Sequence, residues 1–118
     1  MSNVTESYGT IDVSPTAIVT IVGHAVHQCY GVVGMASKKL VNGLARLLSR
    51  RNPHPGIDVN VEEDGITIDV YVIVEYGTRI KTVAQSVQNT VKYHVEKAIP
   101  TMPVKAVNVY VQGVRQDE

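Results

Sequence analysis

The sequence predicts an α+β domain built as a two-layer sandwich, with the element order β-α-α-β-β-α-β. Three observations predict this class: two alternating strands around a tight turn, amphipathic helices before and after them, and a final alternating strand. We expect a small mixed sheet with a central hairpin and with the helices on one face. At 118 residues the chain has room for one domain, which we place at residues 8–114 between tails at 1–7 and 115–118.

The first strand and the first helix have clear boundary signals. The alternating stretch YGTIDV at Tyr8–Val13 predicts a short strand. Ser14 followed by Pro15 is typical of a helix start, because serine caps free backbone N–H groups and proline suits the first helical position. Apolar residues then recur at helical spacing as far as Cys29, and Gly31 ends the helix.

A second amphipathic helix is expected over about Lys38–Arg50, before the helix-breaking stretch RNPHPG. Its apolar residues occupy an arc of about 120°, the width of a stripe that faces a core. The far side of this helix collects three cations within about 40°, namely Lys39, Arg46 and Arg50.

The stretch IDVNVEEDGITIDVYVIVEY predicts a β-hairpin that turns at Asp64-Gly65. A two-residue turn there sets apolar residues opposite one another on a single face: Val61 with Ile68, Val59 with Val70, and Ile57 with Val72. The other face collects mostly polar residues: Asp58, Asn60, Glu62, Thr67, Asp69, Tyr71 and Glu75.

A long helix and a last strand complete the predicted domain. The helix is expected over about Thr78–Ala98, since apolar residues recur at helical spacing and Pro100 lies past its end. Its inner face is expected to consist of Ile80, Val83, Ala84, Val87, Val91, Val95 and Ala98. The stretch VNVYVQGV at Val107–Val114 alternates again and predicts the last strand.

Charge is unevenly distributed along a chain whose net charge is zero. Residues 13–57 contain five bases and no acid, whereas the remainder contains six bases and eleven acids, so the two parts carry +5 and −5. Such segregation indicates two surfaces with different partners. The single Cys29 cannot form an internal disulfide, and no signal peptide or membrane-spanning stretch is recognisable, so we expect a soluble intracellular protein.

The stretch GVVGMASKK at Gly31–Lys39 has two interpretations. In a KH domain a GXXG loop at this place brings backbone amides to nucleotide phosphates, so a KH-like module for single-stranded nucleic acid is the alternative function. Two features argue against nucleic acid. Valines fill the inner positions of the stretch, and the exposed sheet face is acidic with only Tyr71 and Tyr110 as rings. A helix end followed by a turn is the favoured interpretation.

No group of residues indicates catalysis, a metal site or a cofactor. His24 and His27 lie on the side of the first helix opposite its apolar stripe and have no recognisable third ligand. The carboxylates Asp58, Glu62 and Asp69 are expected on an exposed strand face, and we interpret them as a row of solvated acids and not as an active site. Nucleotide-binding and nucleophile motifs are absent from the sequence. We therefore expect a protein that is not an enzyme and takes no cofactor or small-molecule substrate.

The chain resembles the alkaline shock protein family of bacterial envelope-stress proteins over about Tyr8–Val114. The matching stretches are YGTIDVSPTAIVTIVGHAV, GVVGMAS, IDVYVIVEYGTRI, VAQSVQNTVKYHV and VNVYVQGV. The combination of VEYG with the VQNTV helix is the more specific part, and AIPTMPVKAV departs from the glycine-bearing link expected before the last strand. The resemblance implies a non-enzymatic protein at the inner side of the cell envelope, held at the membrane by a partner.

Two surfaces are candidates for partner binding. Lys39, Arg46 and Arg50 form a candidate docking surface for an acidic protein partner or anionic lipid headgroups, and a merely solvated basic face is the alternative. Tyr71 and Tyr110 give the acidic sheet face an apolar group. With the charge segregation, they lead us to expect a homo-oligomer built head to tail. The expected protein is a cytoplasmic scaffold or adaptor, peripheral to the inner face of the membrane through a membrane-anchored partner.

Overall fold

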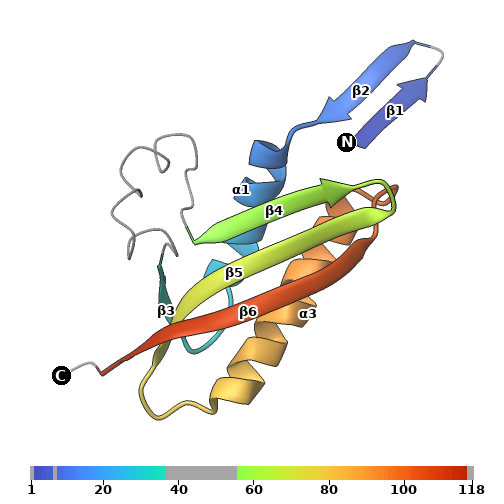
Figure 1. Cartoon of the computed structure of the whole chain (residues 1–118). Coiled ribbons are helices and arrows are strands. Elements are labelled where there is room, and N and C mark those ends of the chain that lie inside the picture. The colour runs from blue at the N-terminus through green and yellow to red at the C-terminus, as the bar shows by residue number, and fades with distance from the viewer. Residues whose placement is uncertain (1, 7, 37–55, 117–118) are drawn as a thin grey trace.

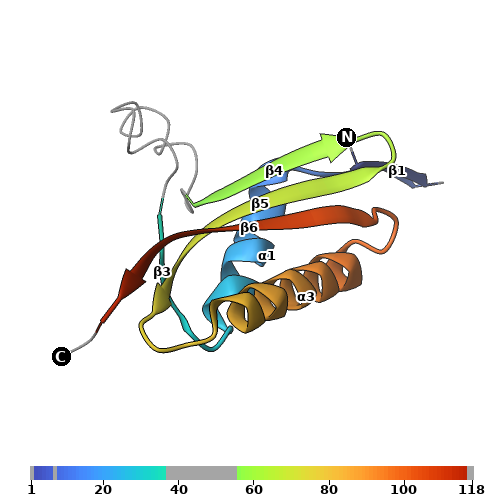
Figure 2. The ribbon, with the colours of Figure 1, turned by 60° about the horizontal axis from the view of Figure 1, so that its bottom comes forward.

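The computed structural model describes residues 2–6, 8–36 and 56–116, and its main body has two layers (Figure 1). The elements in chain order are β1 (Ser2–Glu6), β2 (Gly9–Val13), α1 (Pro15–His27), β3 (Val32–Met35), β4 (Ile57–Glu62), β5 (Gly65–Glu75), α3 (Ile80–Ala98) and β6 (Val104–Arg115). Helices α1 and α3 lie on one face of the sheet of β3, β4, β5 and β6 (Figure 2). The predicted α+β class is confirmed. The helix predicted at Lys38–Arg50 lies outside the described residues.

β5 is the strand around which the sheet is organised. β6 runs parallel to it along one edge, from Ile66 opposite Val104 to Glu75 opposite Arg115. The other edge of β5 is shared end to end by two antiparallel strands, because β4 pairs with its first half and β3 with its second half. The sheet is therefore mixed, as predicted. At each point along β5, this strand lies between β6 on one edge and either β4 or β3 on the other.

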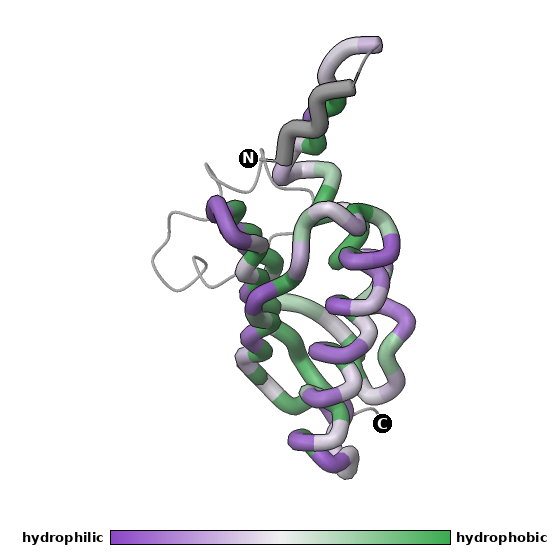
Figure 3. The backbone as a smooth tube through the Cα atoms, turned by 90° about the vertical axis from the view of Figure 1, so that its right-hand side faces the viewer, coloured by the Kyte–Doolittle hydropathy of each residue, from purple (hydrophilic) through white to green (hydrophobic). Residues whose placement is uncertain are grey.

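The core fills the space between the sheet and the two helices. Alternate residues of β5 are fully buried there: Ile66, Ile68, Val70, Val72 and Val74. The helices contribute residues at helical spacing, among them Ile18, Val22 and Val26 from α1 and Val83, Val87, Val91 and Val95 from α3. Figure 3 shows hydrophobic and hydrophilic residues alternating along both kinds of element. Ile80 and Ala98, expected on the inner face of the long helix, are exposed at its two ends.

α1 begins as the sequence predicts. The Ala17 N–H donates a hydrogen bond to the Ser14 hydroxyl oxygen (3.2 Å), and Pro15 occupies the start of the helix. Ser14 itself is in an extended conformation, which is typical of a residue that caps a helix from outside. The helix ends at His27, before the buried Cys29.

The hairpin of β4 and β5 forms, but its predicted register is wrong by two residues. The structure pairs Val61 with Ile66, Val59 with Ile68, and Ile57 with Val70, and the turn is at Glu63-Asp64. A shift of two residues keeps every side chain on its predicted face, because side chains alternate with a period of two. Gly65 allows the segment at Pro103 to pack closely against the start of β5, because a Cβ at Gly65 would lie 2.6 Å from the carbonyl oxygen of Pro103.

Residues of the stretch GVVG form a turn and a strand. Gly31 has a φ of +91°, which lets the chain reverse after α1, as the favoured interpretation expects. Val32–Met35 then form β3 and pair with β5. The sequence pattern predicted only a turn here and missed this strand. In a KH domain the GXXG residues form a loop whose amides are available to phosphates. The strand conformation of Val32–Met35 removes the feature on which the nucleic-acid alternative depended.

The N-terminal tail predicted at residues 1–7 contains a strand. β1 pairs with β2 in an antiparallel hairpin, with Val4 opposite Ile11 and Glu6 opposite Gly9. This hairpin is separate from the main sheet and projects beyond it (Figure 1). At the other end of the domain, β6 continues to Arg115, one residue into the predicted C-terminal tail.

Candidate functional site

The face of the sheet that points away from α1 and α3 is the main candidate site, and we call it the open face. Since alternate residues of β5 from Ile66 to Val74 are buried against the helices, the residues between them point to the opposite side. The strand registers place the residues of β4 and β6 beside them. The open face comprises Asp58, Asn60 and Glu62 of β4, Thr67, Asp69, Tyr71, Ile73 and Glu75 of β5, and Asn108 and Tyr110 of β6.

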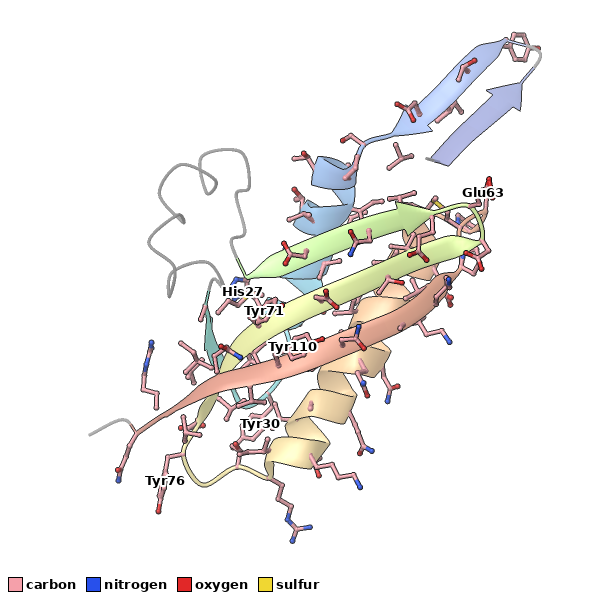
Figure 4. The ribbon with its side chains drawn as sticks, in the orientation of Figure 1. His27, Tyr30, Glu63, Tyr71, Tyr76 and Tyr110 are labelled. Atoms are coloured by element: carbon pink, nitrogen blue, oxygen red, sulfur yellow. The ribbon has the colours of Figure 1, made fainter. Side chains whose placement is uncertain are left out.

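Tyr71 and Tyr110 form a stacked pair at the middle of the open face (Figure 4). The two residues are opposite each other in the parallel ladder, and their ring centroids are 4.8 Å apart with an interplanar angle of 17°. Only 6% of Tyr71 is exposed, compared with 43% of Tyr110. The sequence predicted both residues as contacts for a partner. Because Tyr71 is already covered, Tyr110 is the ring that this pair presents to solvent.

Replacing Tyr110 by alanine is expected to lower the free energy of unfolding by about 1–2 kcal/mol, since a stacked aromatic pair contributes about 0.5–1.5 kcal/mol beyond the area that it buries. Urea denaturation measures the change. The matched control is Tyr8→Ala, because Tyr8 is fully exposed. An equally small effect at both positions would contradict a stabilising role for the stack.

The acids of the open face are partly held by neighbouring side chains. Asp58 and Asp69 are opposite each other across β4 and β5, and the side-chain amide of Asn108 donates to the Asp69 carboxylate (2.9 Å). At the hairpin end, the ammonium group of Lys105 lies 2.9 Å from Glu62 and 3.2 Å from Asp64. Its hydrogen bonds to these two carboxylates raise the pKa of Lys105. These acids therefore help to join β4, β5 and β6.

The segment 37–55 leaves and rejoins the described chain beside Tyr71. The Ala36 N–H donates to the Tyr71 carbonyl oxygen (3.1 Å), and the Tyr71 N–H donates to the Gly56 carbonyl oxygen (2.8 Å). The two ends of this segment are so close that a Cβ on Gly56 would lie 3.0 Å from the Ala36 carbonyl oxygen. All five bases of the acid-free residues 13–57 belong to this segment.

The three predicted cations of the docking surface, Lys39, Arg46 and Arg50, lie outside the described residues. What the structure does fix is the point of attachment of the segment that carries them. This point is the middle of the open face, next to the stacked tyrosines. The ends of the segment that carries the basic part of the predicted partner site thus lie beside the aromatic part.

The histidines agree with their predicted positions, since His24 and His27 are both exposed on α1. Within residues 2–6, 8–36 and 56–116, no three His, Cys, Asp or Glu side chains come together in a way that could hold a metal ion. None of the described helices is long and apolar enough to cross a membrane.

Two exposed apolar surfaces were not indicated by the sequence patterns. One is the N-terminal hairpin, where Tyr8 and Ile11 are exposed. The other lies where the turns after α1 and β5 meet, and it includes the exposed rings of Tyr30 and Tyr76. Helix and strand periodicity cannot show that Tyr30 and Tyr76 lie close together, because they belong to turns from separate parts of the sequence.

Comparison with known proteins supplies a family. The model of the ASP23 family, described as having a cell envelope-related function, matches residues 3–116. This is the alkaline shock protein family that the sequence resembles. Among similar proteins, YloU of Bacillus subtilis is 48% identical over 109 residues, which cover 92% of this chain and 90% of YloU. Spy1614 of Streptococcus pyogenes is 36% identical over 108 residues, covering 91% and 88% of the two chains. A stress response regulator gls24 homologue of the same species is 24% identical over 110 residues, which cover 61% of its length.

Proposed function

The chain belongs to the alkaline shock protein family, with its cell envelope-related function, and we propose that it is a non-enzymatic adaptor at the inner face of the envelope. In this proposal the protein binds an acidic segment of a membrane-anchored partner and also associates with further copies of itself. A role in envelope stress belongs to the same proposal, which the name of the gls24 homologue supports.

The observation that carries the proposal is the place where the basic segment joins the sheet, which is the edge of β5 at Tyr71. A segment of nineteen residues with five bases and no acid begins and ends beside Tyr71. Because its two ends lie beside Tyr71, which stacks on the exposed ring of Tyr110, an acidic partner bound to this segment would have an apolar contact within reach as well as a charged one. Lys39, Arg46 and Arg50 are the residues that we assign to this docking surface.

The size of the electrostatic attraction favours a protein partner over lipid alone. One well-placed cation contributes about 1 kcal/mol of attraction to an anionic membrane, so three contribute about 3 kcal/mol. Even a Kd of about 1 mM requires about 4.1 kcal/mol. A monomer therefore needs additional contacts from a partner to stay at the membrane. Self-association would strengthen this binding further, because several linked copies then bind at once.

The test is the variant Lys39→Glu/Arg46→Glu/Arg50→Glu, with folding checked by circular dichroism. We expect the wild type to sediment with membranes of the source cell and this variant to bind at least tenfold more weakly. The matched control is Lys92→Glu/Lys97→Glu, which reverses exposed charges on α3. This control is expected to bind like the wild type.

Two further membrane samples identify the partner. Protease treatment of the membranes should abolish binding of the wild type, and protein-free phosphatidylglycerol vesicles should retain little of it. Retention on these vesicles equal to that on untreated membranes would instead identify lipid headgroups as the partner. Unchanged binding of the folded triple variant would remove the docking surface from the proposal.

A further inference from the structure

The outer edge of β6 is a long strand edge without a neighbouring strand. β6 pairs with β5 on one side, and no described strand pairs with its other side (Figure 1). From Ala106 to Val111 its ladder with β5 is regular, and this stretch contains no charged residue and no proline. Bulges, charges and prolines are the features that usually keep an edge strand from pairing with another chain. The stretch Ala106–Val111 has none of them.

The contact between α3 and β6 shows which backbone groups point away from β5. The side-chain amide of Gln88 donates to the Val107 carbonyl oxygen (3.0 Å), so the backbone groups of Val107 point to the outer edge. In a paired strand, the N–H and C=O groups of alternate residues point to the same side. Those of Val109 and Val111 therefore also point to the outer edge, where the described residues offer them no hydrogen-bond partner.

α3 satisfies the outer edge only at the beginning of β6, where it lies beneath the strand (Figure 2). Besides the bond from Gln88 to Val107, the Glu96 carboxylate accepts a hydrogen bond from the Val104 N–H (3.0 Å). These two side chains take the place of a neighbouring strand there. Farther along, the edge presents backbone donors and acceptors at the spacing of a strand, and the backbone of another extended segment complements such a row.

The side of α3 next to this edge indicates which side chains such a segment would carry. Gln88 and Glu96 identify the side of α3 that faces β6. Lys81, Gln85 and Lys92 share this side, since they continue it at spacings of three and four residues, and all three are exposed. Glu96 is the only acid of α3 and is already bonded to β6. Carboxylates on an added strand would therefore find ammonium and amide donors beside them.

The other side of an added strand would lie on the open face. Its alternate side chains would be next to Asn108 and Tyr110, and the ring of Tyr110 is exposed. Apolar side chains directly across from an aromatic ring stabilise a strand pair. Asp117 and Glu118 follow the end of β6 and lie outside the described residues, so the charge that we assign to this edge is that of α3 alone.

We propose that the outer edge of β6 binds an extended segment of a second protein, which adds a strand to the sheet. The segment pairs with Val109 and Val111 through its backbone and carries acidic side chains toward α3 and apolar side chains toward Tyr110. This inference goes beyond the proposed function. The basic segment 37–55 joins the sheet at the opposite edge of β5, so the outer edge of β6 would give an adaptor its second binding site.

The probe is a synthetic peptide of about seven residues, the length of a typical strand, in which valine and glutamate alternate. One control peptide has the same side chains and N-methyl groups on its central backbone nitrogens. A second control peptide has lysine in place of glutamate. NMR spectroscopy of the isotope-labelled full chain gives the exchange rates and chemical shifts of the β6 amides with and without each peptide.

In the free protein, the amides of Val109 and Val111 are expected to exchange at least about tenfold faster than those of Asn108 and Tyr110, which point toward β5. The alternating peptide should slow exchange at Val109 and Val111 by about tenfold and shift their resonances. The N-methylated peptide should leave both unchanged, because it lacks the backbone donors. The lysine peptide should bind about tenfold more weakly, since it places cations beside Lys81 and Lys92.

Two variants at Val109 separate the backbone contact from the loss of a side chain. Val109→Pro removes the outward N–H, and an edge strand tolerates proline where the N–H faces solvent. Val109→Ala removes most of the same half-buried side chain and keeps the N–H. With folding checked by circular dichroism, the alanine variant should bind the peptide like the wild type and the proline variant about tenfold more weakly. If Val109→Pro does not fold, the N-methylated peptide makes the same comparison on the wild type.

Four results would count against the proposal. Slow exchange at Val109 and Val111 in the free monomer would mean that the chain itself covers this edge. Slow exchange that appears only with a dimer in sedimentation velocity would make a second copy the occupant. Absence of protection by the alternating peptide, or equal binding of the N-methylated peptide, would exclude an added strand. Equal binding of the lysine peptide would refute the acidic character of the partner.

Discussion

Replacing Gly31 by alanine is expected to lower the free energy of unfolding by about 3 kcal/mol, whereas Gly77→Ala is expected to cost about 1–2 kcal/mol. The two glycines have nearly the same positive φ, +91° and +94°. Both changes therefore impose the strain of a left-handed residue with a side chain. Their surroundings differ, because a Cβ at Gly77 meets nothing within 4 Å, while at Gly31 it would lie 2.7 Å from the Val83 Cγ2 atom.

The extra cost at Gly31 arises because Val83 belongs to the core and has little room to move. Forcing a methyl group into a packed interior typically costs about 1–3 kcal/mol. Urea denaturation of both variants, with tyrosine circular dichroism as the probe, measures the difference between them. Equal losses of stability would mean that α3 moves away from the turn at no cost, in contradiction to the tight contact between this turn and the helix.

The sequence predicts those elements whose signals are local. α1 has a capping serine and a proline at its start, and α3 has a long helical repeat of valines, so both helices form near their expected positions. The hairpin was also recognised, but the dipeptide Asp64-Gly65 suggested the wrong turn. Gly65 is explained by the approach of Pro103 from the distant start of β6, and no local pattern contains this information.

The elements that were missed depend on distant partners. β3 is four residues long and contains a glycine, and it is a strand because the second half of β5 offers an edge with which it pairs. β1 was assigned to a tail because its five residues show no strong alternation of apolar and polar residues. In both strands, pairing decides the structure more than the intrinsic preference of the residues.

The candidate site was predicted in part. Alternation correctly put Tyr71 and Tyr110 on the face away from the helices, but it could not show that they are opposite each other in a parallel ladder, that their rings stack, or that Tyr71 is buried. The exposed surface of Tyr30 and Tyr76 could not be predicted, since the two residues come from separate segments that only the fold brings together. Lys39, Arg46 and Arg50 stay a prediction, now with a defined point of attachment for their segment.

The other large expected loss of stability concerns Ile68 of β5, and Ile73 is its matched comparison. The two isoleucines lie on opposite faces of the same strand. Ile68→Ala is expected to lower the free energy of unfolding by about 3–4 kcal/mol, since this side chain is fully buried and buried Ile→Ala changes cost about 2–5 kcal/mol. Ile73→Ala is expected to cost only about 1 kcal/mol, because Ile73 is half-buried on the open face between Gly34 and Gly113. Denaturant unfolding measures both.

The same pair separates folding from function. A loss of about 3–4 kcal/mol is a large part of the roughly 5–15 kcal/mol that stabilises a typical domain, yet the Ile68→Ala protein that remains folded keeps its open face intact. It should therefore bind membranes of the source cell with the affinity of the wild type at a temperature where it is folded. Ile73→Ala should show the reverse, near-normal stability with weaker binding, because it removes an apolar contact beside Tyr71. If Ile73→Ala binds normally, the partner does not reach this part of the open face, and the docking surface is restricted to the basic segment.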